Sequence, residues 1–223
     1  SDSPGGWQII GRTPVSMYDE SREQAALLKA GDYVRYVPID ESGFHCIKKL
    51  GSSFKPVVHH VKVGDLRGAS FEVVSPGMMT TVQDGGRVGF QQYGMPVAGP
   101  MDGESYAIGQ ALVGNTTPVG ALECTVLSPT LKVKGTCIVA FTGADMRPTI
   151  NNVEVPRYIP FVCHNGDVIS GSFSQCGVRM YISFAGGIDV PEINGSVATH
   201  TKANIGGFEG RPLVAGDEVR LKD

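Results

Sequence analysis

Residues 121–141, ALECTVLSPTLKVKGTCIVAF, decide the fold class, because they hold three short strand-forming runs in close succession. The run Ala121–Val126 ends just before Ser128-Pro129, which is a turn signal, and Thr130–Val133 follows directly. The last run, Cys137–Phe141, is apolar at every position, which predicts a strand buried on both faces. This stretch therefore predicts a sheet protein.

Short strands continue on both sides of this stretch. Upstream, Phe71–Val74 is stopped by the turn tripeptide Ser75-Pro76-Gly77. Downstream, Thr149–Val155 predicts a hairpin, because the asparagines Asn151-Asn152 tolerate the positive φ of a two-residue turn. Val178–Phe184 predicts another buried strand. So many short strands indicate a mainly β fold, a closed or nearly closed β-barrel.

One short helix is expected within this unit. Asp102 is a good N-cap, the apolar residues that follow it indicate a helix over 103–113, and Gly114-Asn115 is a good stop. The preceding stretch, Thr80 to Pro100, is rich in glycine and proline and has no sustained period. It is expected to be an ordered loop that contains no helix or strand.

Charge and composition exclude several classes of partner. The formal net charge of −3, from 19 basic and 22 acidic side chains, gives no reason to expect a nucleic-acid or anionic-membrane partner. No apolar run approaches the roughly 20 residues needed to cross a bilayer, and the start of the chain carries no visible export signal. The five cysteines are scattered and form no CxxC, which favours idle thiols in a reducing compartment. We expect a cytoplasmic protein.

Familiar catalytic and cofactor motifs are absent from the sequence. The pair His59-His60 has no spacing typical of zinc ligands, so solvated histidines are expected and no metal site is predicted. The sequence contains no GxSxG nucleophile motif and no GxxxxGK[ST] phosphate loop. A nucleotide, if one takes part, is therefore not held by a recognisable motif of this chain.

Two distant stretches of the chain read alike and suggest its domain organisation. Residues 28–36, LKAGDYVRY, and 213–221, LVAGDEVRL, share a Gly-Asp turn and a Val-Arg strand, and a diglycine precedes each. Although Gly-Asp turns are common, the repeated order favours two related β domains that end in the same way. We expect residues 1–40 to be the C-terminal tail of one domain, 41–69 a polar, irregular linker, and 70–223 the second domain.

Charged and amide side chains gather on glycine-rich turns. One alternative is that these turns are surface features only. The longest one, however, contains apolar residues such as Val82 and Phe90, which a disordered segment would not retain. A long irregular segment inside a compact domain is typical of a functional loop. The candidates on these turns are Gln83, Asp84, Arg87, Asp145, Glu209 and Arg211.

A family resemblance adds to this interpretation. The segment 75–87, SPGMMTTVQDGGR, resembles the opening signature of the 5-oxoprolinase C-subunit, also described as allophanate hydrolase subunit 2, and the similarity continues over about 150 residues through further motifs. Those motifs include Met101-Asp102, ALVGN at 111–115, ALE at 121–123, TGAD at 142–145 and AGGIDV at 185–190. Residues 3–14, SPGGWQIIGRTP, are similar to the end of the 5-oxoprolinase B-subunit, or allophanate hydrolase subunit 1. The chain thus resembles the tail of a B-subunit fused to the first half of a C-subunit.

The resemblance implies cyclophilin-like β-barrel domains and an amide-activating enzyme. Family members help to open a lactam with ATP as part of 5-oxoprolinase, while the related carboxyltransferase portion of urea amidolyase moves CO₂ from carboxybiotin to urea. The family's older name implies a third alternative, a regulatory module that binds a histidine kinase. The implied partners are the remaining portions of the B- and C-subunits and a large oxoprolinase-type subunit, with ATP or carboxybiotin as possible cofactors.

The resemblance also implies roles for particular residues. Gln83 and Arg87 would donate to a substrate oxygen, and the candidate acids are Asp84, Asp102 and Glu123. The residues expected to bind substrate or line the joint between the two units are Arg12, Asp145, Glu209 and Arg211. For Glu123 and Asp145, plain support of a strand or turn is an open alternative. Because large parts of both subunits are missing from the sequence, a site built between subunits would be incomplete here.

Overall fold

The computed structural model describes residues 12–20, 25–28, 41–50 and 68–222. The chain divides into two compact units, Ser1–His60 and Val61–Asp223.

The first unit contains helix α1, Glu41–Leu50, and a short antiparallel bridge between Tyr18 and Ala26. The expectation of an irregular segment is wrong for these ten residues. Glu41 lies in the first helical turn, and Lys48 and Lys49 lie in the last, so their charges match the helix dipole. This charge pattern indicates a helix, but the polar composition of the segment favoured a linker instead. The first copy of the repeat and the rest of the expected linker lie mostly outside the described residues, and the domain boundaries stay a prediction.

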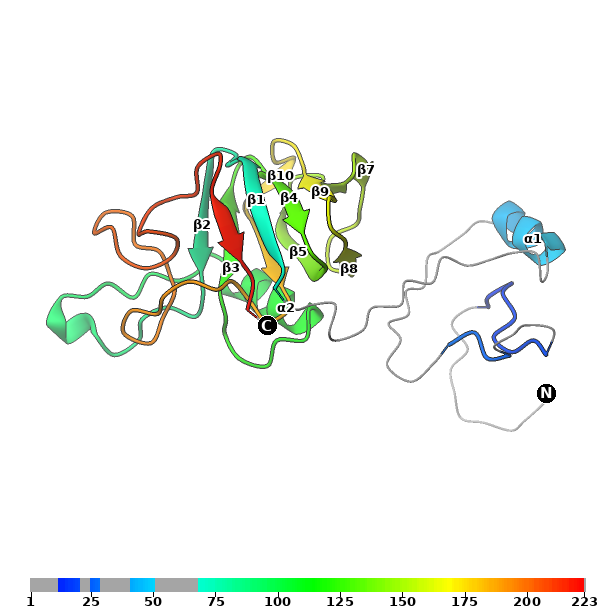
Figure 1. The fold of residues 1–223 in the computed structure, drawn as a ribbon, viewed down its shortest axis with the longest axis horizontal. Coiled ribbons are helices and arrows are strands. Elements are labelled where there is room, and N and C mark those ends of the chain that lie inside the picture. The colour runs from blue at the N-terminus through cyan, green and yellow to red at the C-terminus, as the bar shows by residue number, and fades with distance from the viewer. Residues whose placement is uncertain (1–11, 21–24, 29–40, 51–67, 223) are drawn as a thin grey trace. The chain divides into compact units, whose positions relative to one another are not determined.

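The second unit is built from short antiparallel strands (Figure 1). One sheet has the order β11-β1-β4-β9-β6-β7 and the other has the order β2-β3-β10-β5-β8. The bounds are β1 Ser70–Ser75, β2 Met79–Gln83, β3 Ala121–Thr125, β4 Thr130–Lys134, β5 Cys137–Asp145, β6 Thr149–Ile150, β7 Val153–Glu154, β8 Pro160–Cys163, β9 Val168–Ser170, β10 Cys176–Phe184 and β11 Glu218–Arg220, with a 3-10 turn η3 at Gln91–Tyr93 and helix α2 at Gly103–Leu112.

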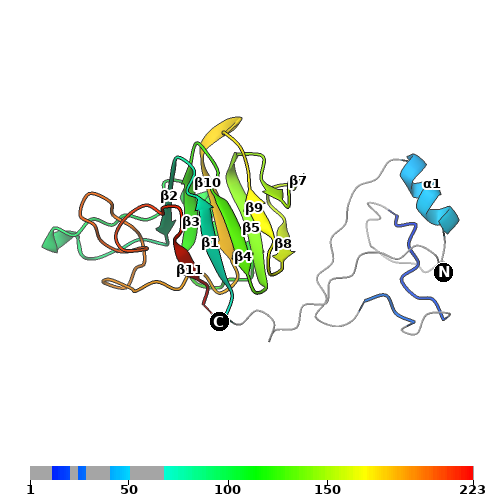
Figure 2. The same cartoon turned by 45° about the horizontal axis from the view of Figure 1, so that its top comes forward.

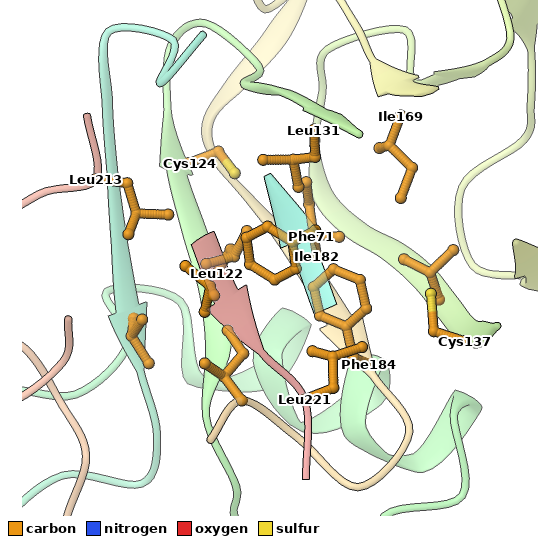
Figure 3. Close-up of a cluster of buried hydrophobic side chains, with 14 of the residues drawn as sticks. Phe71, Leu122, Cys124, Leu131, Cys137, Ile169, Ile182, Phe184, Leu213 and Leu221 are labelled. Carbon is orange, nitrogen blue, oxygen red and sulfur yellow. The ribbon is translucent and has the colours of Figure 1, made fainter. Parts of the chain in front are cut away.

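The main apolar core contains buried side chains from both sheets (Figure 3). Phe71 of β1 stacks on Phe184 of β10, with ring centroids 5.2 Å apart, and both side chains are at most 1% exposed. Stacking of this kind adds to the stabilisation from area burial, so the pair joins one sheet to the other. The predicted class, mainly β with one short helix in the main unit, is confirmed, although the described strands form two sheets and not one continuous ring.

The local signals for the helix and the hairpin are also confirmed. The side chain of Asp102 accepts a hydrogen bond from Ser105 N at the start of α2. Asn151 and Asn152 have φ values of 53° and 63°, which is the left-handed conformation that the turn between β6 and β7 needs.

The expectation of a loop throughout Thr80–Pro100 is wrong at its start, where β2 forms. Thr80, Thr81 and Val82 are β-branched residues that fit a pleated surface, and they pair with β3. The remainder of the stretch contains η3 and otherwise forms no helix or strand. Figures 1 and 2 show this long loop beside the loop of residues 190–212, at the same end of the unit.

Candidate active site

The sheet that contains β2, β3 and β10 has a polar face on the side away from the core. Leu122 and Ile182 point into the core, so their strand neighbours Glu123 and Tyr181 point the other way. Register places Thr81, Glu123 and Tyr181 in one row across the three strands. Alternation along ordinary strands therefore brings a carboxylate and a phenol together.

Glu123 is the centre of a buried hydrogen-bond network on this face. Its Oε2 accepts from Tyr181 Oη at 2.6 Å and from the backbone N of Met101 at 2.8 Å. Its Oε1 lies 3.5 Å from Nε of Arg179, and its side chain is only 6% exposed. Burial, and then the hydrogen bond to Glu123, raises the pKa of Tyr181, so that this phenol stays protonated and donates at neutral pH.

Asp102 joins the same network through Tyr181. The backbone N of Asp102 donates to Tyr181 Oη at 2.8 Å. Its carboxylate accepts from Ser105 Oγ at 2.5 Å and from Ser105 N at 3.0 Å. These hydrogen bonds from Ser105 hold the pKa of Asp102 below its usual value. Two of the acids proposed from sequence, Asp102 and Glu123, are thus brought together, and Asp102 is ionised at neutral pH.

A cleft of ≈360 Å³ opens beside this network. Its wall includes Asp102, Arg157, Tyr158 and Arg179. The cleft lies where β5 and β10 separate, because the pairing shifts register between Cys176 and Met180 of β10. Bulges of this kind are often found next to active sites, where they redirect side chains.

Gln83 and Asp84 connect the loop that follows β2 to the loop of residues 190–212. Gln83 Nε2 donates to the carbonyl of Thr199 at 3.2 Å, and its Oε1 accepts from Gly99 N at 3.2 Å. Asp84 Oδ1 accepts from Ser196 Oγ at 2.6 Å. Both side chains are buried, and neither lines the cleft.

Arg87 is fully buried in the same group of loops. Its Nε donates to the carbonyl of Ile193 at 3.1 Å and its Nη2 donates to the carbonyl of Ala198, while its Nη1 has no partner among the described residues. Burial lowers the pKa of Arg87, and the nearby charge of Asp84 acts in the opposite direction. Gln83, Asp84 and Arg87 therefore form one cluster that holds loops, separate from the cluster of Asp102 and Glu123.

Asp145 and Arg12 are two further sequence candidates. Asp145 Oδ1 accepts from Arg147 N at 3.0 Å, and its Oδ2 lies 3.8 Å from Nη2 of Arg157 at the edge of the cleft. Arg12 lies in the first unit, with its guanidinium 5.3 Å from the ring centroid of Phe44. The role expected for Arg12 at a joint between the units stays a prediction.

Glu209 and Arg211 form an ion-pair cluster with Asp217. Arg211 reaches Glu209 at 2.7 Å, and its two terminal nitrogens reach the Asp217 carboxylate at 2.7 and 2.9 Å. The hydrogen bonds from Arg211 hold the pKa of Asp217 below its usual value, although burial opposes them. Val214 N donates to the same carboxylate at 2.8 Å. The cluster closes the turn before β11, and its expected role in substrate binding stays a prediction.

Replacing Asp217 by asparagine is expected to lower the free energy of unfolding by about 2 kcal/mol at pH 7, since charged hydrogen bonds are lost. A carboxyl group with a lowered folded pKa stabilises the fold above its unfolded pKa of about 3.9, and that stabilisation is lost as the pH falls through the folded value. The difference between wild type and D217N should therefore shrink below about pH 4. Urea unfolding across pH measures it, with the exposed Asp189→Asn as control; a difference independent of pH would contradict this assignment.

Sequence reasoning missed several residues of the cleft. Arg179 and Tyr181 alternate with the buried Met180 and Ile182 in an otherwise apolar strand, and this alternation was a usable signal. Arg157 lies between strands on a segment without a period, so nothing in the local sequence marked it.

Comparison with known proteins identifies the family. Residues 93–223 match the family model described as "Carboxyltransferase domain, subdomain A and B". The chain belongs to this carboxyltransferase-domain family. Residues 1–28 match the companion model for subdomain C and D.

The similar proteins include urea amidolyases and subunits of 5-oxoprolinase. The urea amidolyase of Lachancea kluyveri is 38% identical over 158 residues, covering 70% of this chain and 9% of that protein. The 5-oxoprolinase C-subunit of Escherichia coli is 38% identical over 150 residues, covering 67% of this chain and 48% of that protein. The 5-oxoprolinase B-subunit of Bacillus subtilis is 43% identical over 47 residues, covering 21% of this chain and 20% of that protein.

Solved structures agree with these relatives. The crystal structure of the Kluyveromyces lactis urea amidolyase matches with a TM-score of 0.67 and 38% identity, covering 68% of this chain and 9% of that one. The resemblance to the B- and C-subunits of 5-oxoprolinase and to urea amidolyase is therefore confirmed for this carboxyltransferase-family chain. It spans 48% or less of each named relative. No helix in the described part of the chain is long and apolar enough to cross a membrane.

Proposed function

We propose that this chain is one part of an amide-activating hydrolase of the 5-oxoprolinase type, which works with ATP and a partner subunit. The observation that carries the proposal is the buried hydrogen-bonded pair Glu123–Tyr181 beside the cleft. Glu123 also contacts Arg179, and Arg179 and Asp102 both line the cleft. The similarity to both the B- and the C-subunit of 5-oxoprolinase supports this assignment.

The groups around the cleft suit the activation of an unreactive amide. Attack on an amide carbonyl needs hydrogen-bond donors where negative charge develops on oxygen, and a group that accepts or delivers a proton. Arg157 and Arg179 supply N–H donors, and the Asp102 carboxylate is an acceptor at the same cleft. We assign the buried Gln83, Asp84 and Arg87 to holding the loops in place, and Glu123 to orienting Arg179 and Tyr181.

The cleft does not fit ATP as a resident cofactor. A volume of ≈360 Å³ is near the lower end of the roughly 300–1,000 Å³ typical of ligand sites, and it suits a small amide. The sequence offers no phosphate-binding loop. We therefore place ATP binding on a partner subunit.

The alternative is the carboxyltransferase portion of a biotin-dependent urea carboxylase. The matching family description and the 38% identity to urea amidolyase favour this alternative. The same cleft would then receive urea and the carboxylated ring of biotin. Both reactions act on an amide-like group, so the cleft alone does not separate them.

Affinity capture with the full chain from a native extract, followed by mass spectrometry, separates the two functions. Recovery of a large oxoprolinase-type subunit, with ATP-dependent 5-oxoproline hydrolysis that survives avidin, supports the proposal. Recovery of a biotin carboxylase, with urea carboxylation that avidin abolishes, would replace the proposal with the alternative. We further expect that the purified chain alone does not hydrolyse 5-oxoproline with ATP, because partner groups are missing; turnover by the chain alone would contradict this.

A further inference from the structure

We propose that Cys137 and Cys163 are a redox-sensitive pair, which hydrogen peroxide converts to a disulfide bond that locks strand β8 to strand β5. The inference goes beyond the proposed function and does not depend on it. It assigns a modification site to two thiols to which the sequence gave no role, because they are distant in sequence and form no CxxC.

The pairing of β5 with β8 places the two cysteines directly opposite each other. The antiparallel register pairs Cys137, the first residue of β5, with Cys163, the last residue of β8. The side chains of a directly opposite pair point to the same face of a sheet. Both cysteines belong to the main apolar core, and Figure 3 shows Cys137 within it. The two thiols therefore face each other inside the core.

The spacing of such a pair is compatible with a disulfide bond. The Cα atoms of directly opposite antiparallel residues lie about 4.5–5.5 Å apart, and disulfides span Cα distances of about 4.4–6.8 Å. The Cβ atoms of such residues lie about 4.5–5.5 Å apart, whereas those of a disulfide lie about 3.5–4.5 Å apart. The bond therefore needs only a small approach of the two strands. The strain of this approach makes the bond easier to reduce, which suits a reversible lock.

The closed pair is protected from oxidation. The hydrogen bond with Cys137, and then burial, raises the pKa of Cys163, so both groups stay protonated at neutral pH while the strands are paired. Cys137 is 3% exposed and Cys163 is 0% exposed. Oxidation therefore requires a brief opening of one strand and an oxidant as small as hydrogen peroxide.

Strand β8 is the strand that can open. It is four residues long, lies at the end of its sheet and pairs only with β5 among the described strands (Figure 2). It begins with Pro160, which has no N–H to donate to a neighbouring strand. Cys163 is its last residue, and the ends of short edge strands open at a small cost in free energy. Opening at this end exposes the Cys163 thiol to water and lets it ionise.

The reaction consumes one hydrogen peroxide and two thiols. The Cys163 thiolate attacks one peroxide oxygen and the O–O bond breaks; the hydroxide that leaves takes up a proton to become water, and Cys163 becomes a sulfenic acid. When β8 closes again, the Cys137 sulfur attacks the Cys163 sulfur. The S–S bond forms, the S–O bond breaks, and the second hydroxide leaves as water with the Cys137 proton. The two cysteines lose two electrons, and the peroxide gains them.

The bond would join two strands that border the cleft. β5 contributes Gly143 to the cleft wall, and Arg157 and Tyr158 of the same wall come shortly before β8. Locking β8 to β5 therefore restricts the movement of the segment that carries these two side chains.

Peroxide treatment of the folded full chain, followed by peptide mapping, tests the inference. Cys46 and Cys176 are replaced by serine beforehand, so that only Cys124, Cys137 and Cys163 remain. After treatment at neutral pH and digestion without reductant, we expect peptides that are linked through Cys137 and Cys163 and that dithiothreitol separates. Near-ultraviolet circular dichroism checks that the chain stays folded throughout.

The bond should also change the stability of the second unit. We expect the thermal midpoint to rise by roughly 5 °C, because the cross-link restricts the unfolded chain. Amide hydrogen exchange within β8 should slow about tenfold or more, because the end of this strand no longer opens freely. Dithiothreitol should reverse both changes.

Variants then assign these effects to the two cysteines. Cys137→Ala and Cys163→Ala each remove one partner and should abolish the linked peptide and the peroxide-dependent rise of the midpoint. Cys124→Ala is the matched control, because Cys124 is also fully buried but lies opposite Thr80 and Met180 in register. It should leave the linked peptide and the rise of the midpoint unchanged.

Four outcomes overturn the inference. It fails if both thiols still react with iodoacetamide when the treated chain is unfolded, or if peroxide oxidises them singly to sulfinic acid without a link. It also fails if links to Cys124 form as readily as the link between Cys137 and Cys163. Finally, a link that forms only in urea would show that the folded register plays no part.

Discussion

Replacing Arg87 by methionine is expected to lower the free energy of unfolding by about 3 kcal/mol, because it leaves buried carbonyls without a donor and Asp84 without its positive neighbour. The methionine fills much of the same volume, so the loss reports on hydrogen bonds and charge more than on a cavity. Urea unfolding followed by circular dichroism measures it. The expected loss is a large part of the roughly 5–15 kcal/mol typical of a domain, so the midpoint should shift strongly.

Arg147→Met is the control for this change, because the Arg147 side chain is 57% exposed and its partner Glu154 is equally accessible. A surface ion pair of this kind contributes about 0–1 kcal/mol. If the two methionine variants lose similar amounts of stability, Arg87 does not hold the loops together. A loss of stability in Arg87→Met alone would show that this one buried guanidinium holds the loops together.

The fold was predictable because local signals in this chain agree with the tertiary structure. Cys137–Phe141 is apolar throughout and is buried throughout in β5, and Asp102 caps α2 as its position before an apolar run suggested. The misassigned elements are those whose signals conflict. In β2, three β-branched residues sit at the start of a glycine-rich loop, and the loop composition masked them. In α1, the polar composition masked a helix.

The candidate site was predictable only in part. Residue type and family motifs pointed to Asp102 and Glu123, and the structure brings these two together through Tyr181. The same reasoning grouped Gln83 and Arg87 with them. Gln83 does share the face of β2 that carries Thr81, but its amide is taken up by the two loops, through Thr199 and Gly99. Arg87 lies beyond the end of β2, and its guanidinium donates to loop carbonyls instead. The position of the Arg157 side chain depends on its hydrogen bond to the carbonyl of Gly143, which is distant in sequence, and no local pattern predicts this contact.

Replacing Glu123 by alanine is expected to cost about 3 kcal/mol of stability, because the phenol of Tyr181, the amide of Met101 and the guanidinium of Arg179 all lose a buried acceptor. Glu123→Gln keeps an acceptor oxygen and should cost less. The exposed Glu154→Ala serves as control and should change stability by less than about 0.5 kcal/mol.

A loss of stability in Glu123→Ala no larger than that in Glu154→Ala would contradict this expectation. The hydrogen bonds that Glu123 accepts from Tyr181 and Met101 would then add little to the stability of the fold.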